Sequence, residues 1–282
     1  MKAGRRPVLG EIMFIEWHAD DYGMNAESSR RIIECRQKGI LNGTSILADG
    51  DWSQEPALEE NGLLCAVHLN LVEGRCLSDP GEVPLLVDSR GYFRHSFQGL
   101  FLAGLRPGRK EFMRQVRAEL KLQLDTVMAH MPENYRLRVD SHQHTHLIPV
   151  IYRPLIALLR EGGYTVTYMR IPDEPLGPFL ACPSLWKTIS PLNVIKNLTL
   201  KLCYLLDSLL ICPCPYPTAI FCGILFSGHM DEARVSMVYP YFRRLAEKRG
   251  MPLEFLFHPG YIARREDCVD PRKDDFTSFC TS

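Results

Sequence analysis

Two adjacent aspartates lie near the start of the chain, in 17-WHADDYGMN-25, directly behind the apolar run 12-IMFI-15. Neighbouring carboxylates repel each other, and at a strand end they are costly to bury unless a cation, hydrogen bonds or water compensate them. Asp20 and Asp21 therefore indicate a site that uses acids to bind a metal ion or to transfer protons. Asp21 could instead cap a helix that begins near residue 26, a position that aspartate favours.

Histidines gather at the expected C-terminal ends of three other strands. The segments that contain them are 66-AVHLN-70, 139-VDSHQHTH-146 and 255-FLFHPGY-261. In parallel α/β folds these strand ends meet at one edge, where active sites lie. We therefore expect residues that are far apart in the sequence to share one crevice.

The period of two along a strand predicts where these side chains point. If residues 140–146 are extended, Asp140, His142, His144 and His146 project to one side. A single histidine of this kind is more often a hydrogen-bonded core residue, but the cluster favours a divalent metal site. Two neutral imidazoles and one carboxylate leave room for water and substrate. The cation would compensate one aspartate and keep its neighbour ionised, ready to accept a proton.

Composition excludes some classes of partner. The chain has 282 residues, of which 46% are hydrophobic and 23% charged, as in an ordinary globular protein. Lysine plus arginine equals aspartate plus glutamate at 33 each, so no global field favours nucleic acid or an anionic membrane. The longest apolar segment, residues 198–212, contains Lys201 and Asp207 and is too short to cross a bilayer. We expect it to form a buried amphipathic helix.

Cysteine usage favours the cytoplasm. The ten cysteines contain no CxxC pair, and 212-CPC-214 has no recognised metal spacing, so reduced thiols are expected. The first 17 residues are basic and then apolar, but Glu11 and Glu16 interrupt the apolar part and no cleavage site follows. We therefore expect no signal peptide.

Short apolar runs alternate with stretches of helical periodicity along the chain. Strands are expected at residues 12–17, 44–48, 63–69, 136–140, 164–170, 219–226 and 253–258. Helices are expected at residues 26–38, 53–61, 109–130, 149–161, 184–209 and 231–249, with Asn25 as a cap. Repeated strand-then-helix units predict one α/β domain with parallel strands, either a barrel or a doubly wound sheet. The long loop 73–108 is a candidate lid or substrate wall.

The motifs together resemble the YdjC-like carbohydrate deacetylase family, which includes the ChbG-type chitooligosaccharide deacetylases. The matching segments are 19-ADDYG-23, 67-VHLNLVEG-74, 140-DSHQHTH-146 and 257-FHPGY-261. The resemblance implies an irregular TIM-like (β/α) barrel of mostly parallel strands. No strand pattern follows residue 261, so both a closed barrel and a barrel that is incompletely closed at its C-terminal end fit the sequence. We assign residues 1–264 to the catalytic domain and residues 265–282 to a polar tail.

The resemblance also implies an activity, the hydrolysis of an N-acetyl group on an amino sugar or chitooligosaccharide to acetate and a free amine. It makes Asp21, His68 and His142 the ligands of one divalent metal ion, Asp20 the general base and His258 the general acid. The roles of His144, His146 and His229 stay open. The family implies Mg²⁺, whereas imidazole ligands also suit Zn²⁺. A homodimer is plausible on the same ground.

Two other functions fit the same residues. A metal-dependent hydrolase of a phosphoester or a cyclic amide would need the same donor set around a different pocket. A non-catalytic metal-binding protein is the third alternative. In each hydrolase the partner is a small molecule, and neither nucleic acid nor a membrane is expected.

Overall fold

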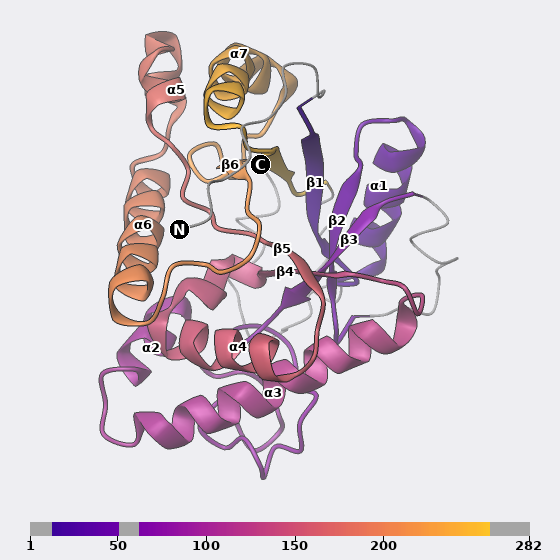
Figure 1. The fold of residues 1–282 in the computed structure, drawn as a ribbon, viewed down its shortest axis with the longest axis vertical. Coiled ribbons are helices and arrows are strands. Elements are labelled where there is room, and N and C mark those ends of the chain that lie inside the picture. Colours follow the sequence, from indigo (N-terminus) through magenta and orange to yellow (C-terminus); the bar gives the residue numbers. More distant parts are fainter. Residues whose placement is uncertain (1–12, 51–61, 260–282) are drawn as a thin grey trace, which may run out of the picture.

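The computed structural model describes residues 13–50 and 62–259, and their strands form one parallel sheet (Figure 1). The strands are β1 (Ile15–Tyr22), β2 (Gly43–Leu47), β3 (Leu64–Leu69), β4 (Leu137–Ser141), β5 (Val166–Met169), β6 (Ile220–Cys222) and β7 (Leu253–Phe257). Their spatial order is β5-β4-β3-β2-β1-β7-β6, and each pair of adjacent strands in this order is parallel. This is the cyclic order of a barrel that is open between β5 and β6. The predicted fold class is confirmed.

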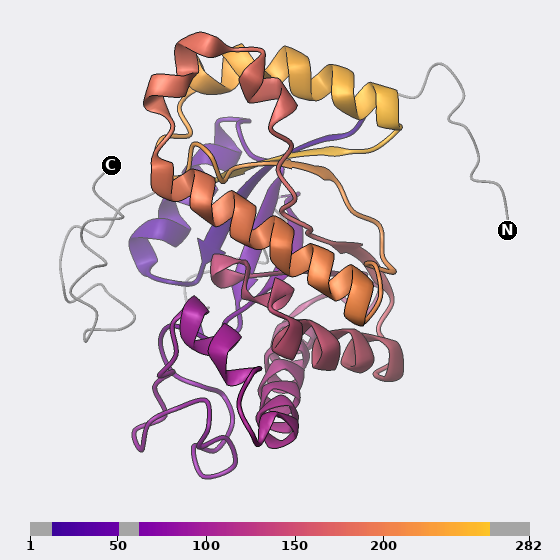
Figure 2. The same ribbon diagram turned by 90° about the vertical axis from the view of Figure 1, so that its left-hand side faces the viewer.

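Helices cover the outer side of the curled sheet (Figures 1 and 2). They are α1 (Ala26–Gln37), α2 (Phe97–Ala103), α3 (Arg109–His130), α4 (Pro149–Glu161), α5 (Gly177–Leu180), α6 (Pro191–Leu210) and α7 (Glu232–Arg249). Two short 3₁₀ helices are η2 (His142–Leu147) and η3 (Pro183–Thr188). Asn25 caps α1 as predicted, because its side chain accepts a hydrogen bond from Ser28 N at 2.8 Å.

The prediction of one helix over residues 184–209 was wrong. The chain forms η3 first, and α6 then begins at Pro191. A proline disfavours helical geometry in the residue before it but suits the first helical position, so it starts a new helix. The sequence analysis missed α2, and the predicted helix 53–61 lies outside the described residues. Strand β1 continues to Tyr22, beyond the apolar run that predicted it.

The loop after β3 is anchored on α3. Glu119 of α3 is fully buried, and its carboxylate accepts hydrogen bonds from the backbone nitrogens of Leu77 and Ser78 at 3.0 and 2.9 Å. Farther along the loop, Leu85 N donates a hydrogen bond of 2.8 Å to Gln115 of the same helix. These contacts fix the position of the predicted substrate wall, whose role stays a prediction.

The opening between β5 and β6 is bridged by a side chain. Glu174, which follows β5, is fully buried, and its carboxylate accepts hydrogen bonds from the backbone nitrogens of Gly223 and Leu225, both at 2.7 Å. These donors lie directly after β6, so the carboxylate joins the two edges that no strand pairing closes in the described part of the chain.

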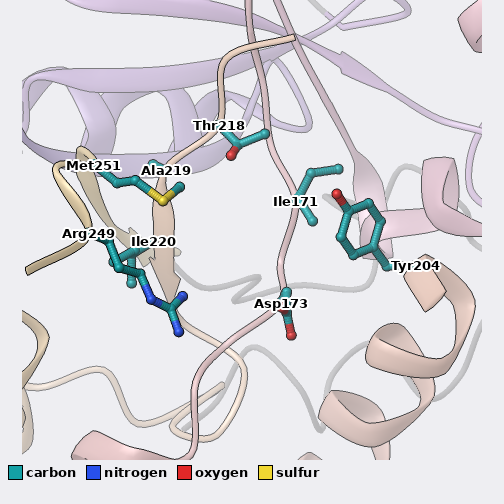
Figure 3. Close-up of a pocket in the computed structure, with 8 residues that line it drawn as sticks. All are labelled: Ile171, Asp173, Tyr204, Thr218, Ala219, Ile220, Arg249 and Met251. Carbon is teal, nitrogen blue, oxygen red and sulfur yellow. The ribbon is translucent and has the colours of Figure 1, made fainter. Parts of the chain in front are cut away.

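Near the same opening lies a hollow of about 180 Å³ (Figure 3). It is lined by Ile171, Asp173, Tyr204, Thr218, Ala219, Ile220, Arg249 and Met251. None of these residues belongs to the four chemistry-bearing motifs, so this hollow is separate from the predicted site.

Candidate active site

The structure brings Asp21, His68 and His142 together at the C-terminal edge of the sheet. Asp21 Oδ1 lies 3.3 Å from His68 Nε2 and 3.0 Å from His142 Nδ1. One donor atom from each residue lies within 4.8 Å of the others, close enough to surround one cation. Residues 121 positions apart therefore form the three-donor set that the resemblance implies.

Backbone strain is concentrated at this cluster. In the described part of the chain, the non-glycine residues with positive φ are Asp21 at 70°, Gln143 at 52° and His144 at 56°. Such conformations cost about 1–3 kcal/mol each and persist where the surrounding structure enforces them, often at functional sites. One of the three is a predicted metal ligand, and the other two directly follow His142.

The strained residue in β1 explains how both aspartates face inward. Adjacent side chains of a regular strand point to opposite faces. The pairing of β1 with β2 is irregular between Ala19 and Tyr22, and Asp21 has its positive φ inside that interval. Such an irregularity can redirect a side chain. As a result, Asp20 reaches Arg170 in the interior while Asp21 reaches His68.

The predicted extended face over residues 140–146 was wrong beyond Ser141. Gln143 and His144 are both left-handed, so the chain turns into η2 at His142. His144 lies edge-on to Phe221 at 5.6 Å between ring centroids. His146 contacts Ser141 Oγ at 2.5 Å and donates from Nε2 to Arg170 O at 2.8 Å. Both side chains are buried beneath the edge of the sheet rather than aligned on one extended face.

The electrostatics of the three-donor set suit a cation. Burial alone would raise the pKa of Asp21, but His142 and His68 hold that pKa well below its usual range. Burial alone would lower the pKa of His68, but the carboxylates of Asp20 and Asp140 raise it to about 9. The carboxylates of Asp21 and Glu73 likewise hold the pKa of His142 well above its usual range, against the effect of burial, so the surroundings of both imidazoles favour positive charge. A divalent ion would supply that charge and displace any proton from the ligating nitrogens.

His68 has the contacts of a metal-ligating histidine. Its Nδ1 lies 2.7 Å from Asp140 Oδ1, while its Nε2 is buried beside Asp21 without the alignment of a hydrogen bond. Ligating histidines commonly donate their other ring N–H to a carboxylate, which fixes the ring and its tautomer. The residues present therefore fit a divalent metal ion.

Arg170 is a central residue that the sequence analysis missed. Its side chain is fully buried, and Nη1 donates to both oxygens of Asp20 at 2.9 Å. Nη2 lies 3.0 Å from Asp140, and Nε donates to Glu254 at 2.8 Å. A charged residue at the end of the predicted strand 164–170 was the signal for it. One guanidinium thus holds the predicted base beside the predicted metal site.

His18, for which no motif was found, lies in the same network. Its Nδ1 is 2.8 Å from Glu16 Oε1, and its Nε2 is 2.6 Å from Ser45 Oγ. Ser45 gives its only hydroxyl proton to Asp140, so it must accept one from His18. The Glu16 carboxylate, at the other ring nitrogen, also accepts a hydrogen bond from Arg138 at 2.5 Å. His18 is thus held on both sides by buried polar groups.

Replacement of Arg170 by methionine is expected to lower the free energy of unfolding by about 3–5 kcal/mol, because three buried carboxylates lose their shared cation. Urea denaturation measures this change. Arg243→Met is the control, since Arg243 is an exposed residue of α7 that interacts with Glu247 and Tyr239 of its own helix. A loss for Arg170→Met as small as that of the control would contradict the structural role.

The remaining predicted residues lie at the same edge or on the surface. His258, at the end of β7, has a side chain 49% exposed, with Nε2 at 3.8 Å from Asp21 Oδ2. Asp49, which the sequence analysis missed, follows β2, and burial raises its pKa to about 6. His229 is exposed on the loop after β6. The 3.8 Å between His258 Nε2 and Asp21 Oδ2 places the predicted general acid beside the three-donor set.

Comparison with known proteins identifies the family. The sequence model described as YdjC-like protein matches residues 16–282. The chain belongs to the YdjC-like family. This assignment covers all the residues placed in the site above.

Named relatives agree with the family. A carbohydrate deacetylase of Thermoanaerobacter pseudethanolicus is 33% identical over 132 residues, which cover 45% of this chain and 49% of that protein. A chitooligosaccharide deacetylase of Serratia marcescens is 28% identical over 145 residues, covering 49% and 52%. The chain spans about half the length of the curated relatives it matches.

A crystal structure from Enterococcus faecalis V583, described as a candidate cellobiose-phosphate cleavage protein, superimposes with a TM-score of 0.59. It is 18% identical, and the match covers 96% of this chain and 91% of the other. At this identity the likeness shows the fold alone.

Proposed function

We propose that this YdjC-like protein is a metal-dependent deacetylase that removes N-acetyl groups from amino sugars or chitooligosaccharides. The observation that carries the proposal is the convergence of Asp21, His68 and His142 into one three-donor set, with Asp20 beside it. The names of the relatives, carbohydrate deacetylase and chitooligosaccharide deacetylase, support the substrate class.

Asp21, His68 and His142 would hold the ion, which supplies polarisation of the acetyl carbonyl and acidification of a water molecule. Asp20 accepts a proton from the attacking water. Arg170 and the barrel interior keep its carboxylate oriented and almost wholly buried, at 4% exposure. His258, on the exposed side of the cluster, donates a proton to the departing amine.

The ion is proposed to be Mg²⁺ on the strength of the family resemblance. The two imidazoles of the donor set also suit Zn²⁺. Reactivation of chelated protein by each ion in turn tells the two apart.

Acetate release from N,N′-diacetylchitobiose, measured with and without a chelator, tests the function. We expect release that the chelator abolishes and that added divalent metal restores. A hydrolase of phosphoesters or cyclic amides would bind metal but release no acetate. A non-catalytic protein would bind metal and turn over none of these substrates.

A cytoplasmic location is part of the proposal. The described cysteines are all free thiols, as expected in a reducing compartment. No helix within residues 13–50 and 62–259 is long and apolar enough to span a bilayer.

We also propose that two copies of the chain pair through α6, which lies on the outside of the molecule in both views (Figures 1 and 2). The prediction of a buried amphipathic helix was right for only one side, where Leu200 and Cys203 are buried together with the polar residues Asn193, Asn197 and Asp207. Asn193 donates hydrogen bonds to two backbone carbonyls after β6. Its exposed apolar residues are Leu192, Ile195, Leu198, Leu202, Leu205, Leu209 and Leu210.

The exposed row from Ile195 to Leu209 has alternating spacings of three and four, the pattern of a helix that pairs with another helix. A symmetric two-fold contact of this kind is the commonest in homo-oligomers.

Sedimentation of the protein at micromolar concentration is expected to show a dimer, which the double substitution Leu202→Glu, Leu205→Glu converts to a monomer. Buried carboxylates across such a seam would repel each other. Leu122→Glu, at an exposed leucine of α3, is the matched control and should leave the dimer intact. A monomeric wild type, or a dimer in the double variant, would refute pairing through α6.

A further inference from the structure

Each imidazole of the three-donor set lies between Asp21 and a second, buried carboxylate. His68 faces Asp21 with Nε2 at 3.3 Å and Asp140 with Nδ1 at 2.7 Å. His142 has the opposite orientation, since its Nδ1 is 3.0 Å from Asp21 and its Nε2 is 3.4 Å from Glu73 Oε2. The two rings therefore turn different nitrogens toward the shared aspartate.

The second carboxylate beside His142 is built into the structure. Glu73 is 3% exposed, and its backbone is held by Asn70, whose Nδ2 donates to Glu73 O at 2.7 Å and whose Oδ1 accepts from Glu73 N at 3.2 Å. Gln123 of α3 in turn clamps the backbone of Asn70 with two hydrogen bonds of 2.7 and 2.8 Å. The backbone of Glu73 is therefore held from α3, independently of the histidine.

Glu73 also contacts the strained turn that follows His142. Gln143 Nε2 donates to Glu73 Oε1 at 3.2 Å, so one carboxylate oxygen faces Gln143 and the other faces His142. Gln143 is one of the left-handed residues, and this bond helps to hold it in that conformation. A single carboxylate thus fixes both the ring of His142 and the turn that carries it.

We propose that Glu73 is a positioning residue for His142. Its carboxylate accepts a hydrogen bond from Nε2–H of His142, and this orients Nδ1 of the same ring toward the metal ion. The proposal rests on the proposed metal-dependent function. In it, His142 binds through Nδ1 and His68 through Nε2, each oriented by its own carboxylate. Outer carboxylates of this kind typically contribute about 10–100-fold to metal affinity.

The dissociation constant for Zn²⁺, measured by competition with a chelator, tests the role of Glu73. We expect Glu73→Ala to weaken binding by about 10–100-fold. Glu73→Gln should bind Zn²⁺ more tightly than Glu73→Ala, because its amide oxygen still accepts a hydrogen bond from the imidazole. Glu82→Ala, at an exposed glutamate of the same loop, is the control and should bind as the wild type does.

Long-range ¹H–¹⁵N spectra of the zinc-loaded wild type give a second test that needs no variant. They should show the Nδ1 of His142 and the Nε2 of His68 as the ligating nitrogens. Ligation of His142 through Nε2, or wild-type affinity in Glu73→Ala, would overturn the positioning role and leave the deacetylase proposal intact. A wild type that binds no zinc through these histidines would overturn both.

Discussion

Protein that carries both His68→Ala and His142→Ala is expected to retain no stoichiometric divalent metal and to lose at least about 10⁴-fold in kcat/KM for deacetylation. The expected loss is at or above the upper end of what one general acid or base contributes, because the metal acts on both the carbonyl and the water. Metal analysis of the desalted protein and acetate release from N,N′-diacetylchitobiose measure the two effects.

A matched control is the substitution His130→Ala. His130 lies at the exposed end of α3, where its ring contacts the carbonyl of Thr126 in the same helix. This control should keep its metal and its activity. A normal metal content in the His68→Ala, His142→Ala protein would show that the ligand set is wrong.

Asp20→Asn is expected to reduce deacetylation by about 10²–10⁴-fold while the metal content stays normal. The substitution removes the proton acceptor but leaves Asp21, His68 and His142 unchanged. It also puts an amide against Arg170, so thermal unfolding of the variant should be recorded alongside its activity. Undiminished acetate release by a folded Asp20→Asn protein would rule out Asp20 as the base.

The positions of the strands and of the site could be predicted because burial and chemistry follow simple patterns. Nearly continuous apolar runs such as residues 253–257, which Glu254 interrupts, predict strands that are buried on both faces, and β7 occupies that range. Asp21, His68 and His142 each lie at or just after the end of a strand, so parallel topology alone brings them near one another. The resemblance then supplied their roles.

The contacts below the site could not be predicted, because they depend on partners distant in the sequence. Arg170 binds Asp20 across 150 positions, and nothing near either residue reveals the pair. No sequence motif marks His18, whose contacts with Glu16 and Ser45, and through Ser45 with Asp140, form only in the folded chain. Such networks are properties of the folded interior, where charges must be compensated by whichever groups the sheet brings close.

Two further predictions did not hold in full, one because of backbone conformation and one because of side-chain burial. The alternation rule failed at His142 because Gln143 and His144 adopt left-handed geometry, which is uncommon in residues other than glycine. The apolar content of α6 suggested burial, but a row of leucines faces outward, and the inward side combines Leu200 and Cys203 with two asparagines and Asp207. Asn193 and Asn197 donate hydrogen bonds to backbone carbonyls of the barrel, so polar contacts contribute to the packing of that side.

Anomalous diffraction from crystals grown with Zn²⁺ or Co²⁺, recorded at the metal edge, locates the ion directly. One strong peak within coordination distance of Asp21, His68 and His142 is the predicted result. The structure contains a second group of three close donors, His18, Asp20 and Asp140, deeper in the barrel. A peak at that deeper group, or no peak beside Asp21, would contradict the central claim.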